Sequence, residues 1–199
     1  MKKVFSLLAA ALLALSLCVT ASAEKYTVIR GDSLWKIAVR YKVGLDELIG
    51  ANPQIKNPDL IYPGDVIEVP VDSSAAAAFE AEVVRLVNVI RSQNGLKQLE
   101  EDWQLSRVAR YKSRDMAQKH YFSHTSPTYG SPFDMIKAFG ISYRTAGENI
   151  AMGQRTPQAV VDAWMNSPGH RANILNPAFT KIGVGFEDYY WTQMFTGGS

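Results

Sequence analysis

The stretch Ala163-Trp-Met-Asn-Ser-Pro-Gly-His-Arg171 decides how the second half of this 199-residue chain folds. A Thr156-Pro157 pair precedes it, and a Ser167-Pro168 pair lies inside it. Each pair joins a helix-capping residue to a proline that fits the first turn of a helix. The stretch therefore predicts two short consecutive helices, the first carrying Trp164 and the second carrying His170.

The sequence on either side of this stretch has clear helical and strand patterns. Apolar residues recur at three- and four-residue steps over 79–94 and 102–119, and a shorter helix is expected over 133–139. Two strand-like segments, 181–186 and 189–195, close the chain. Helices combined with a small sheet in this order predict an α+β fold, arranged as a three-layer α-β-α sandwich.

Four motifs in this half of the chain are the most specific. They are Tyr121-Phe-Ser-His-Thr-Ser-Pro127, Gly147-Glu-Asn-Ile-Ala151, the 163–171 stretch and Ile182-Gly-Val-Gly185. Together they resemble the CAP superfamily, also called the SCP domain, in its cysteine-free bacterial form. The resemblance runs from Phe79 to Phe195, and we assign residues 79–199 to this domain.

The resemblance implies a central cleft in which two histidines and an acidic residue converge. By matching motifs, the candidate catalytic residues are His124, Glu148 and His170. In some members of the family the histidine pair binds zinc, so His124 and His170 are also candidate metal ligands, although no cofactor is required. Many eukaryotic members carry a second glutamate three residues after the helix tryptophan, where this chain has Ser167. That departure weakens a hydrolytic interpretation.

The residues themselves argue against two common catalytic designs. His120 and His124 have the four-residue spacing of zinc ligands on a helix, but a His-Glu-x-x-His protease needs glutamate at position 121, which is Tyr121. A loop signal also follows His120, so we expect this residue to be exposed. Ser123 lies beside a histidine without the Gly-x-Ser-x-Gly elbow of serine hydrolases, and Ser167 is explained as a helix cap.

The first half of the chain predicts a smaller unit with the order strand, helix, helix, strand. The expected strands cover 26–30 and 65–69, and the expected helices cover 34–41 and 45–51. The turn Gly31-Asp-Ser33 supplies the cap of the first helix. This segment therefore predicts a small βααβ module.

Three motifs in this module resemble the LysM family: Gly31-Asp-Ser-Leu-Trp-Lys-Ile-Ala38, Asn52-Pro53 and Leu60-Ile-Tyr-Pro-Gly64. That family binds glycans containing N-acetylglucosamine, such as peptidoglycan or chitin, in a shallow groove between two loops. The resemblance implies that the groove is lined by Gly31, Asp32, Ser33 and Leu34 from one loop and by Asn57, Pro58, Leu60, Ile61 and Tyr62 from the other. The glycines and prolines also punctuate turns, so part of the motif is structural.

The N-terminal segment predicts export. Lys2 and Lys3 precede an apolar run, and Ala21-Ser-Ala23 matches the pattern that signal peptidase reads, so we expect residues 1–23 to be a signal peptide. The run is short for a membrane span, and we expect no stable membrane insertion after cleavage. The single cysteine, Cys18, lies in this run, so the mature chain would contain neither disulfides nor thiol chemistry.

The predicted mature chain is electrically neutral. The sequence has 21 Lys and Arg against 19 Asp and Glu, and the leader removes two lysines. Neutrality argues against nucleic acid as the main partner. A run of small residues over 72–78 predicts a linker between a 24–71 module and the 79–199 domain, although its alanines could also extend the following helix.

Three functions remain open from the sequence. The first is a secreted, cell-wall-associated protein that binds peptidoglycan, or another N-acetylglucosamine polymer, through the LysM module and displays the CAP domain. The second is a metal-assisted hydrolase acting on wall material or peptides. The third is a CAP domain that binds a protein or lipid partner without chemistry. The sequence separates neither the last two functions from each other nor the possible oligomeric states.

Overall fold

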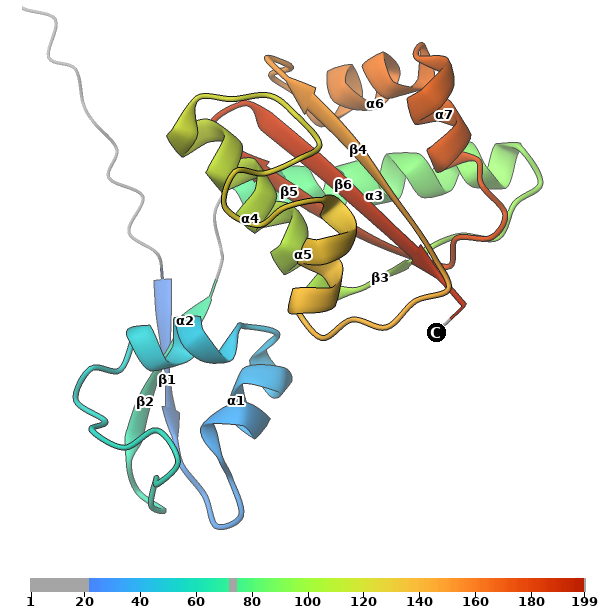
Figure 1. The fold of residues 1–199 in the computed structure, drawn as a ribbon. Helices are drawn as coiled ribbons and strands as arrows, with labels where there is room; N and C mark the ends of the chain where they lie inside the picture. The colour runs from blue at the N-terminus through green and yellow to red at the C-terminus, as the bar shows by residue number, and fades with distance from the viewer. Residues whose placement is uncertain (1–21, 72–74, 199) are drawn as a thin grey trace, which may run out of the picture.

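The computed structural model describes residues 22–71 and 75–198, which form two modules with separate hydrophobic cores (Figure 1). The signal peptide expected over 1–23 lies outside the described residues except for its last two positions. In the described part of the chain, no helix combines the length and the apolar character needed to cross a lipid bilayer.

The first module has the expected strand-helix-helix-strand order. Its elements are β1 (Ser22–Thr27), α1 (Leu34–Tyr41), α2 (Leu45–Gly50) and β2 (Val66–Val71). The two strands pair antiparallel, and the Ser33 hydroxyl caps α1 by accepting a hydrogen bond from the Lys36 amide. The helices pack on the hairpin around a core of Val28, Leu34, Ile37, Ala38, Leu48, Ile67 and Val69.

Several boundaries in this region differ from the sequence prediction, including the end of β1 at Thr27 instead of residue 30 and the end of β2 at Val71 instead of residue 69. Strand β1 begins at Ser22 instead of residue 26, because β2 offers paired positions as far as Val71. Glu24 and Lys25 have little strand preference of their own, so the ladder decides their conformation. Helix α3 (Ala75–Gln93) includes the alanines of the predicted linker, as their high helix propensity allows.

The second module contains the remaining elements. They are α3, β3 (Glu100–Glu101), α4 (Trp103–Lys119), α5 (Pro132–Ala138), β4 (Thr145–Met152), α6 (Pro157–Met165), α7 (Pro168–Ile174), β5 (Lys181–Glu187) and β6 (Tyr190–Gly197). Polar side chains cap three of these helices at their start: Asp102 for α4, Ser131 for α5 and Thr156 for α6.

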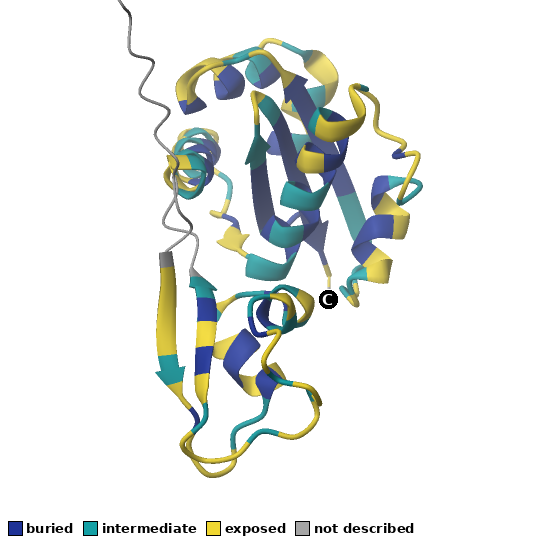
Figure 2. Cartoon of the chain, turned by 90° about the vertical axis from the view of Figure 1, so that its left-hand side faces the viewer, coloured by how far each residue is buried: buried dark blue, intermediate teal, exposed yellow. Residues whose placement is uncertain are grey.

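The predicted α-β-α sandwich is confirmed. The sheet has the strand order β3-β5-β6-β4, with β3 parallel to β5 and the other pairs antiparallel. Helices α4 and α5 pack on one face, and α3, α6 and α7 pack on the other. The central strands are buried between these two helix layers (Figure 2).

Strands β3 and β4 are absent from the sequence prediction. Strand β4 contains glycine, glutamate and asparagine, which are all depleted in strands, so its local sequence gives no strand signal. Its strand conformation comes from pairing with β6 along eight residues. Strand β3 has only two residues, which is too short for any periodic pattern.

Helix α4 lies unusually close to strand β5. A Cβ atom built on Gly183 would lie 2.2 Å from the backbone carbon of Leu105, and one built on Gly185 would lie 2.2 Å from that of Ala109. Neither glycine has a positive φ, so the backbone conformation does not itself require glycine. The absence of a side chain at these two positions is what allows the helix to reach its observed distance from the sheet.

We predict that Gly183→Ala and Gly185→Ala each lower the free energy of unfolding by at least roughly 2 kcal/mol, because the new methyl group overlaps backbone atoms that cannot rotate away. Urea denaturation measures the effect. Gly169→Ala is the matched control, because no atom beyond its chain neighbours and the backbone of its own helix lies within 4 Å of its Cβ position. Wild-type stability in the Gly183 and Gly185 variants would contradict the tight approach.

Candidate functional site

The second module brings His124 and Glu148 into direct contact across 24 residues of sequence. His124 lies in the loop that follows α4, and Glu148 lies in the edge strand β4. Nδ1 of the imidazole is 2.6 Å from Oε1 of the carboxylate. The glutamate side chain is 2% exposed, whereas the histidine side chain is 56% exposed. The pair therefore joins a buried acid to a ring that solvent can reach.

The two candidate histidines have different proton affinities. The hydrogen bond to Glu148 raises the pKa of His124, and partial burial of the ring opposes this effect. Burial lowers the pKa of His170, and the nearby charge of His124 lowers it further. Both shifts make His124 more readily protonated than His170.

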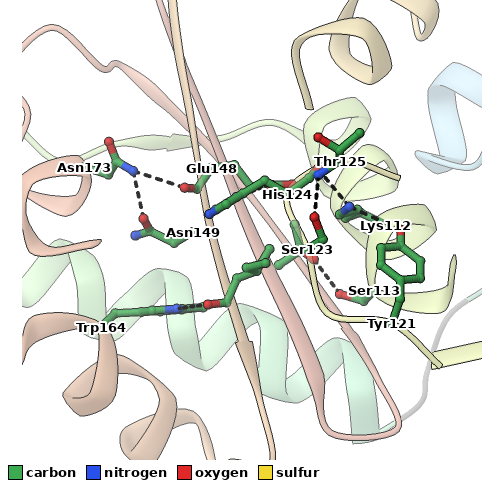
Figure 3. Close-up of polar contacts among 12 residues, drawn as sticks. Lys112, Ser113, Tyr121, Ser123, His124, Thr125, Glu148, Asn149, Trp164 and Asn173 are labelled. Atoms are coloured by element: carbon green, nitrogen blue, oxygen red, sulfur yellow. Dashed lines mark hydrogen bonds and ion pairs between the residues drawn. The ribbon is translucent and has the colours of Figure 1, made fainter. Parts of the chain in front are cut away.

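Asn149 connects the strand that carries Glu148 to helix α7. Its side-chain nitrogen donates to the backbone carbonyl of His170 at 3.1 Å and to Oε1 of Gln193 at 3.0 Å. Asn173 donates to the backbone carbonyl of Glu148 at 3.1 Å and to Oδ1 of Asn149 at 2.8 Å (Figure 3). These bonds hold His170 next to the strand that carries the buried acid.

Local backbone structure explains the positions of His120, Ser123 and Ser167. His120 is the C-terminal cap of α4, with a left-handed φ of 53°. The residue is exposed, as predicted. Ser123 accepts a hydrogen bond from the Thr125 amide within its own loop. Ser167 occupies the N-cap position of α7, but its side chain makes no capping hydrogen bond there.

The loop that carries His124 is anchored on the buried carboxylate of Asp115, in the last turns of α4. This carboxylate accepts hydrogen bonds from the hydroxyls of Tyr121 and Ser126, both at 2.7 Å, and of Thr128 at 2.5 Å. Lys119 adds an ion pair at 3.1 Å. Burial alone would raise the pKa of Asp115, but these donors outweigh it and lower the pKa to about 2.

Lys112 is the second buried anchor of this loop. Its side chain is fully buried, and its Nζ donates to the backbone carbonyl of His124 at 2.9 Å and to the Tyr121 hydroxyl at 3.2 Å (Figure 3). Burial lowers the pKa of Lys112, and the charges of Glu148 and Asp115 oppose that shift. The ammonium group therefore fixes the backbone of the residue whose imidazole contacts Glu148.

Sequence reasoning missed both anchors, although a signal for Lys112 exists. Lys112 follows Leu105 and Ala109 at steps of four and three, so it lies on the apolar face of α4. A lysine in such a register is buried only when it has partners. That register was available from the sequence, but the partners lie in a loop whose course the sequence does not define.

The described residues do not fit a zinc site with three protein ligands. His124 already uses Nδ1 on Glu148, and within 22–71 and 75–198 no three His, Cys, Asp or Glu side chains gather closely enough to hold a metal ion. Zinc sites in proteins take three or four protein ligands. One polar feature at the site is unexplained, because Oε2 of Glu148 is buried and has no hydrogen-bond partner in the described part of the chain.

The two loops predicted to bind glycan emerge from the same end of the first module, which points away from the second module (Figures 1 and 2). Backbone hydrogen bonds from Gly64 to Val28 at 2.9 Å and from Val28 to Asp65 at 2.8 Å hold the loops together. The second loop presents Asn57, Leu60 and Tyr62 as exposed residues, with Pro58 and Ile61 half-buried.

The first loop offers less side-chain surface than the sequence predicts. Leu34 is buried in the core, so its side chain does not line a surface groove. The Asp32 carboxylate accepts hydrogen bonds from the Tyr26 hydroxyl, the Ile29 amide and the Arg40 guanidinium, which hold the loop in place. Gly31 and Ser33 remain accessible, together with the backbone of this loop.

An exposed aromatic residue beside this loop is missing from the predicted set. Trp35 is 61% exposed at the start of α1. The sequence contains a signal for it, because Leu34, Ile37 and Ala38 follow the helical apolar register and Trp35 does not. An aromatic side chain outside the apolar register of a short helix faces solvent.

This architecture, an α-β-α sandwich preceded by a βααβ module, defines a two-module protein of the kind that the sequence motifs indicate. The model of the cysteine-rich secretory protein family, CAP, matches residues 84–196, and that of the LysM domain matches residues 26–70. The chain therefore belongs to the cysteine-rich secretory protein (CAP) family and carries a LysM domain in front of its CAP domain.

Relatives match each module. The uncharacterized protein YkwD of Bacillus subtilis is 62% identical over 126 residues, which cover 62% of this chain and 49% of that protein. The secreted LysM effector ECP6 of Passalora fulva is 40% identical over 73 residues, covering 37% of this chain and 30% of that protein. The chain thus spans about half the length, or less, of these curated relatives.

A solved structure matches the second module. It is an extracellular protein containing a SCP domain from Bacillus anthracis, 35% identical in sequence, with a TM-score of 0.62. The match covers 68% of this chain and 47% of that one.

We predict that Asp115→Asn destabilises the CAP domain by about 2 kcal/mol at neutral pH, because the carboxylate has a lower pKa in the folded chain than in the unfolded chain. This contribution is present above about pH 4 and is lost as the pH falls toward 2. Urea denaturation at several pH values measures it, with Asp188→Asn at an exposed turn as control. A stability difference that does not shrink in acid would contradict this account.

Proposed function

We propose that this protein is exported and attaches through its LysM domain to a polymer of N-acetylglucosamine-containing glycan, of which peptidoglycan is the first to test. The observation that carries this proposal is the free end of the LysM domain, where both predicted loops lie together with exposed Leu60 and Tyr62. An acetamido sugar needs accessible backbone amides and carbonyls and a flat apolar surface for its methyl group. This end of the domain offers both.

Charge and copy number define the expected mode of binding. The predicted mature chain is neutral, so its affinity for a wall polymer comes from sugar recognition and depends little on salt. One LysM domain matches the chain, at residues 26–70, and a single shallow site lacks the avidity of several linked copies. We therefore expect modest affinity that suits a protein held at the wall reversibly.

Export and wall attachment would place the CAP domain and its His124–Glu148 pair outside the cell. The predicted leader supports export, and two relatives are described as secreted and as extracellular. In this first candidate the CAP domain is a module displayed at the wall.

We predict that the mature protein, residues 24–199, sediments with purified peptidoglycan and that deletion of residues 24–71 leaves the CAP domain in the supernatant. Tyr62→Ala weakens binding roughly tenfold, equivalent to about 1.4 kcal/mol, because it removes an exposed flat surface. Val39→Ala, at an exposed apolar residue of α1, is the matched control with unchanged binding. Equal sedimentation with and without residues 24–71 would contradict the proposal.

A second candidate, a hydrolase, is favoured by one observation, the 2.6 Å contact between a solvent-accessible imidazole and a buried carboxylate. Such a pair can act as a general base toward water, because the carboxylate orients the ring and stabilises its protonated form. Among the described residues near the pair, Ser123 has its hydroxyl oriented toward its own loop. A hydrolytic step would therefore use water, activated by His124, as the nucleophile.

The hydrolase candidate predicts that the wild-type protein releases soluble fragments from peptidoglycan and that Glu148→Gln abolishes this release. The same variant should lower the pKa of His124, measured by NMR, because the hydrogen bond that raises it is weakened. Glu101→Gln, at an exposed position of β3, is the control that keeps both properties. Fragment release that persists in Glu148→Gln would show that the His124–Glu148 pair does not catalyse hydrolysis.

A further inference from the structure

One carboxylate of the LysM domain contacts the CAP domain. Glu47, in α2, accepts from Arg107 of α4 at both carboxylate oxygens, with Nε 3.3 Å from Oε1 and Nη2 2.9 Å from Oε2. The hydroxyl of Tyr111 donates to the same Oε1 at 3.0 Å. Arg107 and Tyr111 are four residues apart, so they lie on one face of α4. A two-pronged guanidinium contact of this kind fixes orientation as well as distance.

The CAP side of this contact is held in position by aromatic packing. The Arg107 guanidinium lies 5.3 Å from the centre of the Phe139 ring, which follows α5. The Tyr111 ring meets the same Phe139 ring edge-on, also at 5.3 Å between centres. Both donors therefore have little freedom to lose when they bind the carboxylate. The side chains are also partly shielded, with Arg107 17% exposed and Glu47 32% exposed.

The LysM side is shaped to admit the guanidinium. Gly44 is the N-cap of α2 and has an ordinary backbone conformation, with φ −71° and ψ 148°, and no side chain caps the helix. Serine, threonine or aspartate would normally stabilise such a position. A Cβ on Gly44, however, would lie 1.5 Å from Oε2 of Glu47 and 2.1 Å from Nη2 of Arg107. The backbone does not require glycine here, but the contact between Glu47 and Arg107 in its observed geometry leaves no room for a side chain at this position.

We propose that Arg107 and Tyr111 form a docking site on the CAP domain for helix α2 of its own LysM domain. Glu47 is the residue that binds this site, and the absence of a side chain at Gly44 leaves room for the Arg107 guanidinium. The two domains then move as one body. Only three residues separate β2 from α3, so the effective concentration of one domain at the other is on the order of millimolar. A contact of modest intrinsic strength is therefore occupied most of the time.

Docking through α2 leaves the glycan-binding end of the LysM domain free. The loops of that end lie on the far side of the domain from α4 (Figures 1 and 2). A docked LysM domain therefore presents these loops to a polymer while holding the CAP domain in one direction behind them. This consequence concerns domain orientation, and the docking itself does not depend on glycan binding.

The test is ¹⁵N relaxation of the two-domain protein from Ser22 onward, which reports a rotational correlation time for each domain. We expect one shared value for the wild type. In Glu47→Gln and in Gly44→Ala, we expect the value of the LysM domain to become roughly 1.5-fold shorter or more, because this contact no longer couples its tumbling to that of the CAP domain. Gly44→Ala is informative because it displaces the flexible ends of Glu47 and Arg107 without removing a charge.

Two further variants separate docking from folding. Asp46→Asn removes a neighbouring exposed acid of α2 and should keep the shared correlation time. The exchange Glu47→Arg with Arg107→Glu should restore it, whereas Glu47→Arg alone should not. Two distinct values in the wild type, or one shared value in both Glu47→Gln and Gly44→Ala, would overturn the proposal. Dispersed LysM amide resonances confirm that each variant is folded. If a single variant unfolds, the test uses the correlation times of Glu47→Arg alone and of the double variant Glu47→Arg with Arg107→Glu.

Discussion

Helix α4 and strand β5 approach each other so closely that a methyl group would not fit between them at Gly183 or Gly185. This contact sets the position and the rotation of α4 on the sheet. It thereby fixes which faces of the helix contact the His124 loop and the LysM domain. One face places Lys112 and Asp115 under the loop that carries His124. Another presents Arg107 and Tyr111 to the LysM domain. A shift of α4 would move all four side chains at once.

The His124 loop depends on buried polar groups more than on apolar packing. Phe122, its large apolar residue, is 48% exposed, whereas the Lys112 ammonium and the Asp115 carboxylate are buried. Unpaired charges at such positions are costly, so the loop must supply the hydroxyls and the carbonyl that satisfy them. The hydrogen bonds to Lys112 and Asp115 hold the His124 loop against Glu148 from one side. Asn149 and Asn173 hold the strand of Glu148 from the other side.

The two ends of the LysM domain make different contacts. The LysM domain has its exposed loops at one end and its contact with α4 at the other, so both can be used at once. The predicted mature chain carries no net charge that would attract it to a polyanion. Under the proposed function, sugar recognition at the far end and the Glu47–Arg107 contact at the near end would together hold the CAP domain in one direction at a wall polymer.

Local sequence determined most of the elements and both families. Helical periodicity, capping pairs and the Gly31–Ala38 and 163–171 motifs act over short distances, so they can be read without a structure. Strand β4 could not be read in this way, because its polar residues become a strand only by pairing with β6. In the first loop, Asp32 and Leu34 matched a binding motif, but the tertiary structure uses both side chains internally.

The candidate site shows the same division. The residue types His124, Glu148 and His170 follow from motifs, but their spacing of more than twenty residues says nothing about distance. Only the fold brings the imidazole to 2.6 Å from the carboxylate, buries Lys112 beneath it and brings Glu47 to Arg107. The sequence by itself therefore determined the modules and their motifs. The tertiary structure decided which side chains meet, because burial and long-range pairing depend on the whole packed chain.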